Sequence, residues 1–389
     1  MPRIIYFDHA ATTPLKPAVL DAMLPYFHSF FGNPSGIYSI STSNHKAMTQ
    51  ARHEAASFFN AKDHEIYFSA SATESDNWAL KGIAEANRHK GNHIITSSIE
   101  HHAVLHTCQY LETVGFEVTY LPVDESGCIS LEELASAIRP STILVSIMFA
   151  NNEIGTIEPI KAIGLLCHER HIIFHTDAVQ AISHCPIDVE EYHIDLLSAS
   201  AHKIGGPKGV GLLYIRSGIK ISSLLHGGSQ ERHRRAGTEN LAGIIGFAKA
   251  LSLIEFGKRQ EELAILRDYL SERILREIPF SRLNGSTTNR LSGNVNISFQ
   301  FIEGESLLIM LDQKGICASS GSACTSGSLD PSHVLLAIGR SHDEARGSLR
   351  LTIGETTTIE EIDFVVDELK QIISRLRSMS PAFCQSIKE

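Results

Sequence analysis

Short apolar segments alternate with amphipathic segments through the first two-thirds of the chain. The apolar segments predict seven strands, at 66–68, 93–96, 118–121, 142–149, 172–175, 195–198 and 210–215. The amphipathic segments predict helices near 16–31, 44–59, 74–88, 103–113, 131–138 and 160–170. Strands that alternate with helices in this way are typical of a mostly parallel sheet with helices on both faces.

The pattern changes after about Phe256. A long charged helix is expected first, and further helices and two strands follow, at 258–278, 294–299, 305–314, from 332 onward and at 348–353. A closing amphipathic helix carries its apolar residues on one face: Ile362, Val365, Val366, Leu369, Ile373 and Leu376. We therefore predict a large α/β domain over 14–256 and a smaller α+β domain formed by 1–13 together with 257–389.

Composition narrows the class of protein without fixing its chemistry. Of the 389 residues, 43% are hydrophobic and 20% are charged, which is ordinary for a soluble globular enzyme. The net charge of −10 argues against nonspecific binding to nucleic acid or to anionic membranes. The longest apolar run, 241–256, is interrupted by Lys249 and is too short to cross a membrane. We expect no nucleic-acid partner and no membrane span.

The cysteine content indicates a reducing compartment. The chain has seven cysteines and no Cys-x-x-Cys pair, so we expect neither a disulfide framework nor a zinc site. Only a short apolar stretch precedes Asp8, and it does not resemble a signal peptide. These features predict a cytoplasmic protein with no resident metal.

Polar side chains follow two of the predicted strands, at the carboxyl ends where parallel sheets place their ligands. They are Asp177, Gln180, Ser200, His202 and Lys203. This set suits pyridoxal phosphate: the lysine amine can bind its aldehyde, the carboxylate can keep its ring nitrogen protonated, and the amide can bond its ring oxygen. The serine and the histidine can reach its phosphate. From the local pattern alone, a capping aspartate and a surface glutamine are equally good interpretations.

Two further motifs extend the pattern. The segment 69–74 joins a strand to a helix, and the spacing of Ser71 and Glu74 is that of a capping box. The N-terminus of the helix presents free N–H groups, which suit a phosphate. An ordinary helix cap is the alternative. Cys324 lies among small residues in the segment 319–328, which indicates an accessible cysteine on a loop. Cys317 has apolar neighbours and is predicted to lie in the core.

Together these motifs resemble the cysteine desulfurases, which are fold-type I pyridoxal phosphate enzymes of the class-V aminotransferase family. The long Gly/Ser-rich loop around Cys324, about 317–332, resembles the NifS/IscS-like class. The resemblance runs from Asp8 to Leu376. It implies an α/β fold with a seven-stranded, mostly parallel sheet, and an enzyme that converts L-cysteine to L-alanine and keeps the sulfur on Cys324 as a persulfide.

The resemblance also implies the residues that hold the cofactor. Lys203 would bind it and move the substrate proton, Asp177 would face its ring nitrogen, and Gln180 would face its ring oxygen. The expected phosphate ligands are Ala72, Thr73, Ser200 and His202, together with Thr238, which would act on the cofactor of the other subunit in a homodimer.

Three more roles follow from the same resemblance. His101 would lie against the ring and act as an acid and base, which suits an imidazole near neutral pH. Asn152 would contact both the cofactor and the substrate. Arg350 would form a two-pronged contact with the substrate carboxylate, as a planar guanidinium can. Lys203, Cys324 and His101 are thus the expected catalytic residues.

Some alternatives stay open. A selenocysteine lyase or another pyridoxal phosphate lyase of this fold would share most of the motifs, and so would a non-catalytic scaffold for sulfur transfer. The expected partner is a sulfur acceptor or an iron–sulfur scaffold protein, with which Cys324 could transiently ligate a cluster. The sequence departs from the usual family pattern at His9 and at 36–38.

Overall fold

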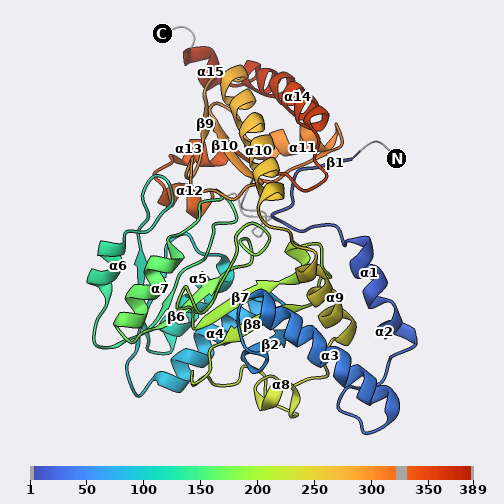
Figure 1. Ribbon diagram of the computed structural model, residues 1–389. Helices are drawn as coiled ribbons and strands as arrows, with labels where there is room; N and C mark the ends of the chain where they lie inside the picture. The colour runs from blue at the N-terminus through green and yellow to red at the C-terminus, as the bar shows by residue number, and fades with distance from the viewer. Residues whose placement is uncertain (1–3, 321–330, 387–389) are drawn as a thin grey trace.

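The computed structural model describes residues 4–320 and 331–386. Its larger part is built on one seven-stranded sheet with the strand order β2-β8-β7-β6-β5-β3-β4 (Figure 1). The strands are β2 (Ile66–Ser69), β3 (His93–Ser97), β4 (Glu117–Leu121), β5 (Thr142–Ser146), β6 (Ile173–Asp177), β7 (Leu196–Ser200) and β8 (Gly211–Ile215). Strand β8 runs antiparallel to both of its neighbours, and the other pairs are parallel. The predicted fold class is confirmed.

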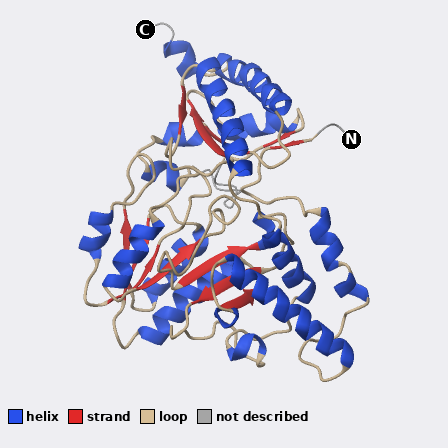
Figure 2. Cartoon of the chain, in the orientation of Figure 1, coloured by secondary structure: helices blue, strands red, loops and turns tan. Residues whose placement is uncertain are grey.

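Helices cover both faces of this sheet (Figure 2). Consecutive strand residues belong to different hydrophobic clusters: Leu144 packs on one face of β5 and Val145 on the other. Both faces must therefore be apolar, which explains the continuous hydrophobic runs in the sequence. The helices and short helical turns of this part are α1 (Pro17–Met23), α2 (Pro25–His28), α3 (Ser39–Phe58), η1 (Asp63–Glu65), α4 (Ala72–Asn87), α5 (His102–Thr113), α6 (Leu131–Ala137), α7 (Ile160–Glu169), η2 (Ala201–Lys203), α8 (Gln230–His233) and α9 (Leu241–Ser252).

The helix predicted near 16–31 is interrupted. Helix α1 ends at Met23, and α2 begins at Pro25. Proline has no backbone N–H and restricts the residue before it, so it is tolerated at the first position of a new helix but not inside an old one. Among the described residues no helix is both long and apolar enough for a membrane crossing. Helix α9, which covers the longest apolar run, has 12 residues.

The remaining elements surround a three-stranded antiparallel sheet with the order β12-β10-β9. They are β1 (Ile5–Tyr6), α10 (Lys258–Glu277), β9 (Ser281–Leu283), β10 (Asn294–Phe299), α11 (Gly304–Asp312), β11 (Ile316–Cys317), α12 (His333–Ala337), α13 (His342–Arg346), β12 (Ser348–Thr352), α14 (Ile359–Ser378) and α15 (Pro381–Ser386). One hydrophobic cluster joins Ile5 and Phe7 to residues from Leu263 to Ile373. The predicted boundaries, 14–256 and 1–13 with 257–389, stay a prediction.

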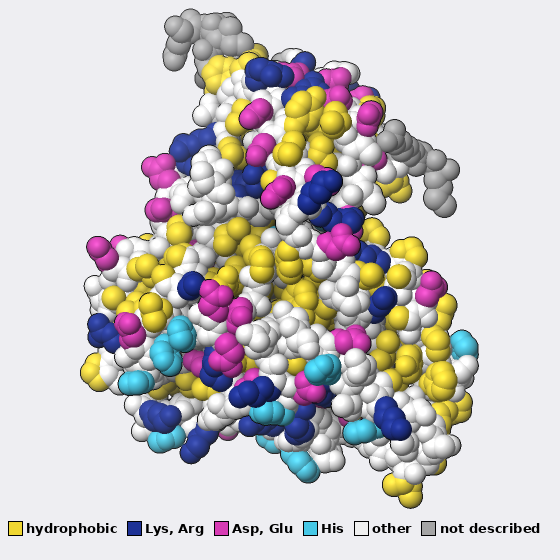
Figure 3. Space-filling model, in the orientation of Figure 1, with side chains coloured by type: hydrophobic (Ala, Val, Ile, Leu, Met, Phe, Trp, Pro, Cys, Tyr) yellow, Lys and Arg dark blue, Asp and Glu magenta, His cyan; other side chains and the backbone are white. Residues whose placement is uncertain are grey.

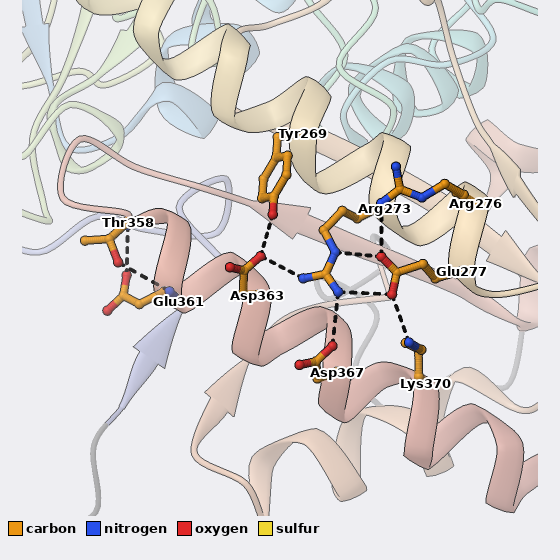
Figure 4. A network of polar contacts seen from close by, with 9 residues as sticks. All are labelled: Tyr269, Arg273, Arg276, Glu277, Thr358, Glu361, Asp363, Asp367 and Lys370. Carbon is orange, nitrogen blue, oxygen red and sulfur yellow. Dashed lines mark hydrogen bonds and ion pairs between the residues drawn. The ribbon is translucent and has the colours of Figure 1, made fainter.

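Charged side chains tie α10 to α14 (Figure 4). Arg273 donates to Glu277 on its own helix and to Asp363 and Asp367 on α14, at 2.7 to 3.0 Å. Lys370 adds a bond to Glu277 at 2.9 Å. Charged residues of α10, Arg273 and Glu277, thus take part in the contact between α10 and α14.

Candidate active site

Gln180 and Lys203 both donate a hydrogen bond to the backbone carbonyl of Ala10. Lys203 lies on η2, directly after β7, and its Nζ donates to the carbonyls of Ala10 and Ala11. Gln180 follows β6 and donates to the Ala10 carbonyl at 3.0 Å. The two strands are parallel neighbours, so their carboxyl ends bring the two side chains to the same edge of the sheet. The N-terminal segment closes over them.

Asp177 is a buried acid at this edge. Its Oδ1 accepts the Val179 N–H at 3.0 Å, and the residue is only 7% exposed. Burial raises the pKa of Asp177 to about 6, while the Val179 N–H and the nearby charge of Lys203 oppose that rise. A carboxylate placed in this way can hold a proton on a partner nitrogen.

A second acid lies behind Asp177, and sequence reasoning missed it. Asp76 on α4 is 1% exposed, and its Oδ1 lies 3.7 Å from His175 Nε2. His175 Nε2 is also 3.0 Å from Ser198 Oγ. Burial and the charge of Asp177 raise the pKa of Asp76, whereas burial lowers that of His175 to about 3. The linear sequence holds no signal for this group, because α4 and β6 meet only in the fold.

His101 caps helix α5. Its Nδ1 accepts the Ala103 N–H at 3.1 Å, so in the neutral ring the proton belongs on Nε2. Burial lowers the pKa of His101 to about 4, and the charge of Lys203 adds to this effect. The imidazole is therefore neutral near pH 7 and can accept a proton.

Three of the predicted phosphate residues, Ala72, Thr73 and Ser200, lie at or beside the start of α4. Ser71 caps the helix by accepting the Glu74 N–H at 3.2 Å. The N–H groups of Ala72 and Thr73 lie in the first turn, where a helix offers them no acceptor. Gly211 pairs with Ser200 across β7 and β8, and a side chain at Gly211 would collide with Ser71. This close packing places Ser200 beside the helix start.

His202 is held against the N-terminal segment. Its Nδ1 lies 3.1 Å from Thr12 Oγ1, and its carbonyl accepts from Thr13 Oγ1 at 2.8 Å. Burial, followed by the charges of Lys203 and Lys208, lowers the pKa of His202 to about 4.

Arg350 and Asn152 are in direct contact. Arg350 Nη1 donates to the Asn152 carbonyl at 3.0 Å, and Nη2 donates to Asp8 Oδ1 at 2.8 Å. The Arg350 side chain is 3% exposed, whereas that of Asp8 is 18% exposed. The role of Asp8 as the carboxylate partner of Arg350 was not predicted, since the two residues lie at opposite ends of the chain.

Cys324 lies outside the described residues, but both flanks of its segment are fixed at the site. Before it, the backbones of Ser319 and Arg350 exchange two hydrogen bonds, at 2.6 and 3.2 Å. After it, Ser332 donates to Glu153 at 2.5 Å, and His333 Nε2 lies 3.0 Å from the Glu100 carbonyl, directly before His101. The described residues on either side of the segment therefore lie at Arg350 and beside His101.

Cys317 is half-buried on β11, where it pairs with Tyr6, so its predicted place in the core was wrong. An edge strand of a two-stranded sheet leaves one side open.

His9, where the sequence departs from the usual family motif, packs against Gly354. A side chain at position 354 would collide with the His9 ring.

Thr238 is exposed beyond α8. Three consecutive residues before it, Glu231, Arg232 and His233, have φ of 43°, 57° and 64°, a backbone conformation that side chains other than glycine rarely adopt. Thr238 lines a small cavity with Ala70, which precedes the start of α4.

The sequence matches the model of one known protein family. The class-V aminotransferase model matches residues 5–365. This chain belongs to the class-V aminotransferase family. The family resemblance inferred from the motifs is thereby confirmed.

Its relatives in this family match over nearly the whole chain. A protein named cysteine desulfurase IscS from Methanosarcina thermophila is 58% identical over 381 residues, which is 97% of this chain and 94% of that protein. The solved structure of a NifS-like protein has a TM-score of 0.90 at 36% identity and covers 96% of this chain and 100% of its own. A structure of SspA in complex with cysteine has a TM-score of 0.81 at 39% identity and covers 91% of this chain and 99% of its own.

Class-V aminotransferases of this kind depend on pyridoxal phosphate, and the residues present fit that cofactor. Lys203 supplies an amine and Asp177 a buried carboxylate at the same sheet edge. The first turn of α4 supplies open N–H donors for a phosphate.

Proposed function

We propose that this protein is a pyridoxal phosphate-dependent cysteine desulfurase. It converts L-cysteine to L-alanine and retains the sulfur on Cys324 as a persulfide. The observation that carries the proposal is the position of the described residues that flank Cys324: Ser319 is bonded to Arg350, and His333 lies beside His101. The names of the relatives and the cysteine bound in a related structure support the same activity.

Lys203 would bind the cofactor aldehyde, Asp177 would face the ring nitrogen, and Gln180 would face the ring oxygen. Asn152 would contact the ring oxygen and the substrate. The phosphate would be held by Ala72, Thr73, Ser200 and His202 and by the partner's Thr238. When bound, the cofactor withdraws electrons from the substrate, and this weakens the bond between Cβ and sulfur.

The substrate carboxylate binds to Arg350. Its guanidinium is already oriented by Asp8 and by the Asn152 carbonyl, so little rotamer freedom is lost when the substrate binds. The planar group offers donors to both carboxylate oxygens.

The protons are moved by Lys203 and His101. Lys203 takes the proton from the substrate Cα, and the neutral ring of His101 exchanges protons with the substrate. The Cys324 thiolate then attacks the substrate sulfur. A sulfur–sulfur bond forms as the bond between Cβ and sulfur breaks, its electron pair stays on carbon, and a proton completes the methyl group of alanine.

We further propose a cytoplasmic homodimer that delivers sulfur to iron–sulfur cluster assembly or to another sulfur-containing cofactor. Large apolar side chains are exposed along α1, α2 and the loop after them (Figure 3). They include Leu20, Leu24, Phe27, Phe30 and Phe31, which are 42% to 74% exposed. A patch of this kind is typical of an interface with another protein chain, here a second copy. Persulfide sulfur on Cys324 would pass to an acceptor protein.

The experiment follows labelled sulfur through one turnover. Purified protein is mixed with L-cysteine carrying radioactive sulfur, the persulfide is trapped by alkylation, and the labelled peptide is identified by mass spectrometry. Label is expected on Cys324. Cys324→Ala should keep the cofactor colour but lose sulfur release about a thousandfold, as nucleophile deletions do.

Cys317→Ala is the matched control and should keep its activity. Label on Cys317, or undiminished sulfur release in Cys324→Ala, contradicts the assignment. A Cys324→Ala protein that still released selenium from selenocysteine would instead identify a selenocysteine lyase.

A further inference from the structure

A carboxylate lies within the first turn of the helix that holds the cofactor phosphate. Glu74 is the third residue of α4, one position after Thr73. Its side chain turns back, and Oε2 accepts the Ala70 N–H at 3.2 Å. An ionised glutamate at this position stabilises the helix end but repels a phosphate that binds to the same turn.

Arg235 neutralises this carboxylate. Its Nε and Nη2 donate to the two oxygens of Glu74 at 2.8 and 3.1 Å. The two side chains are 16% and 15% exposed, so water screens the pair only weakly. Hydrogen bonding to Glu74 raises the pKa of Arg235, and the guanidinium stays charged at every working pH.

The position of Arg235 is fixed by its own segment. Four residues earlier, Glu231 forms a buried two-pronged ion pair with Arg52, at 2.7 and 2.8 Å. Glu231 also accepts the Phe68 N–H at 3.0 Å, at the end of the strand that leads to α4. Arg235 is therefore held against the helix start.

We propose that Arg235 is a positioning residue for the cofactor phosphate: by pairing with Glu74, it removes the carboxylate charge from the first turn of α4 and leaves the N–H groups of Ala72 and Thr73 to bind the phosphate. The inference rests on the proposed function, in which this turn holds the phosphate. Arg235 acts through Glu74, so its effect disappears when Glu74 is made neutral.

The test compares two aldehydes that differ in the phosphate alone. Pyridoxal phosphate and pyridoxal are titrated, by absorbance, into the full-length protein after its cofactor has been removed. The parent is compared with Arg235→Gln, Glu74→Gln and the double variant. Glutamine in place of Glu74 keeps the oxygen that accepts the Ala70 N–H.

Arg235→Gln should weaken pyridoxal phosphate binding roughly tenfold and leave pyridoxal binding unchanged. Glu74→Gln should bind pyridoxal phosphate at least as well as the parent. The double variant should recover the affinity that Arg235→Gln loses. A purely structural role would weaken both aldehydes alike, and a second neutral substitution would not rescue it.

Equal losses for both aldehydes, or a double variant as weak as Arg235→Gln, overturn the inference. Ala72→Pro separates this failure from that of the proposed function, because proline has no N–H and is tolerated at the first position of a helix. An Ala72→Pro protein with an unchanged preference for pyridoxal phosphate would show that the phosphate does not bind at this turn, and both proposals would fall. A reduced preference in Ala72→Pro, with none in Arg235→Gln, would defeat the inference alone.

Discussion

Replacing Arg350 with lysine tests the substrate-binding part of the proposed mechanism. Arg350 is 3% exposed and makes two hydrogen bonds, to Asp8 and to the Asn152 carbonyl. A lysine amine keeps the charge, but it is a compact group that cannot hold both partners and also grip a carboxylate. A hydrogen bond to a charged group contributes about 1.5–3 kcal/mol. Losing one or two of them should cost about 2–4 kcal/mol, and kcat/KM should fall roughly 30- to 1000-fold.

The assay measures initial rates of alanine formation across a range of L-cysteine concentrations. Arg282→Lys is the matched control, because Arg282 lies on β9 of the same small sheet, is 50% exposed and reaches Glu125 only at 3.3 Å. Thermal unfolding and cofactor absorbance show whether each variant is folded and loaded. An Arg350→Lys protein with kcat/KM close to that of the parent refutes the reasoning.

Three further predictions concern the cofactor and the buried acids. Lys203→Ala should fold but lose turnover, and borohydride should no longer attach the cofactor; attachment to another lysine in the parent would defeat the assignment. Thr238→Ala should release cofactor faster than the parent, and a fully active monomer in sedimentation would rule out shared sites. Burial raises the pKa of Glu100 from 4.5 to about 8, so stability falls as pH rises between these values. Glu100→Gln should therefore melt above the parent at pH 8.5 and near it at pH 5, and the reverse order would contradict the pKa shift.

Much of the sheet was predictable, because each strand is a short apolar run that ends in polar residues. The sequence alone places Asp177, Gln180 and Lys203 after the ends of β6 and β7. Strand β9 was missed, since its three residues are only half-buried or exposed and carry no apolar run. The break at Pro25 was missed because the apolar spacing continues across it.

Pairings between distant residues could not be predicted. Arg52 and Glu231 lie 179 positions apart, and their ion pair depends on how α3 packs against the segment after β8. Asp8 and Arg350 are 342 positions apart. Local spacing carries no information about such contacts, and the family resemblance implies a substrate-binding role for Arg350 but no carboxylate partner.

The site differs from the apolar core because it contains several buried carboxyl groups. Asp76, Glu100 and Asp177 are all buried, and burial raises the pKa of each. Nearby carboxylates in a region of low dielectric cannot all be charged at once. Lys203 favours the ionised form of Asp177, and a protonated ring nitrogen beside it would favour that form further. Asp76, which faces a neutral His175, is then the acid that keeps its proton. Asp76 thus holds a proton, and Asp177 carries the negative charge at the edge of the sheet.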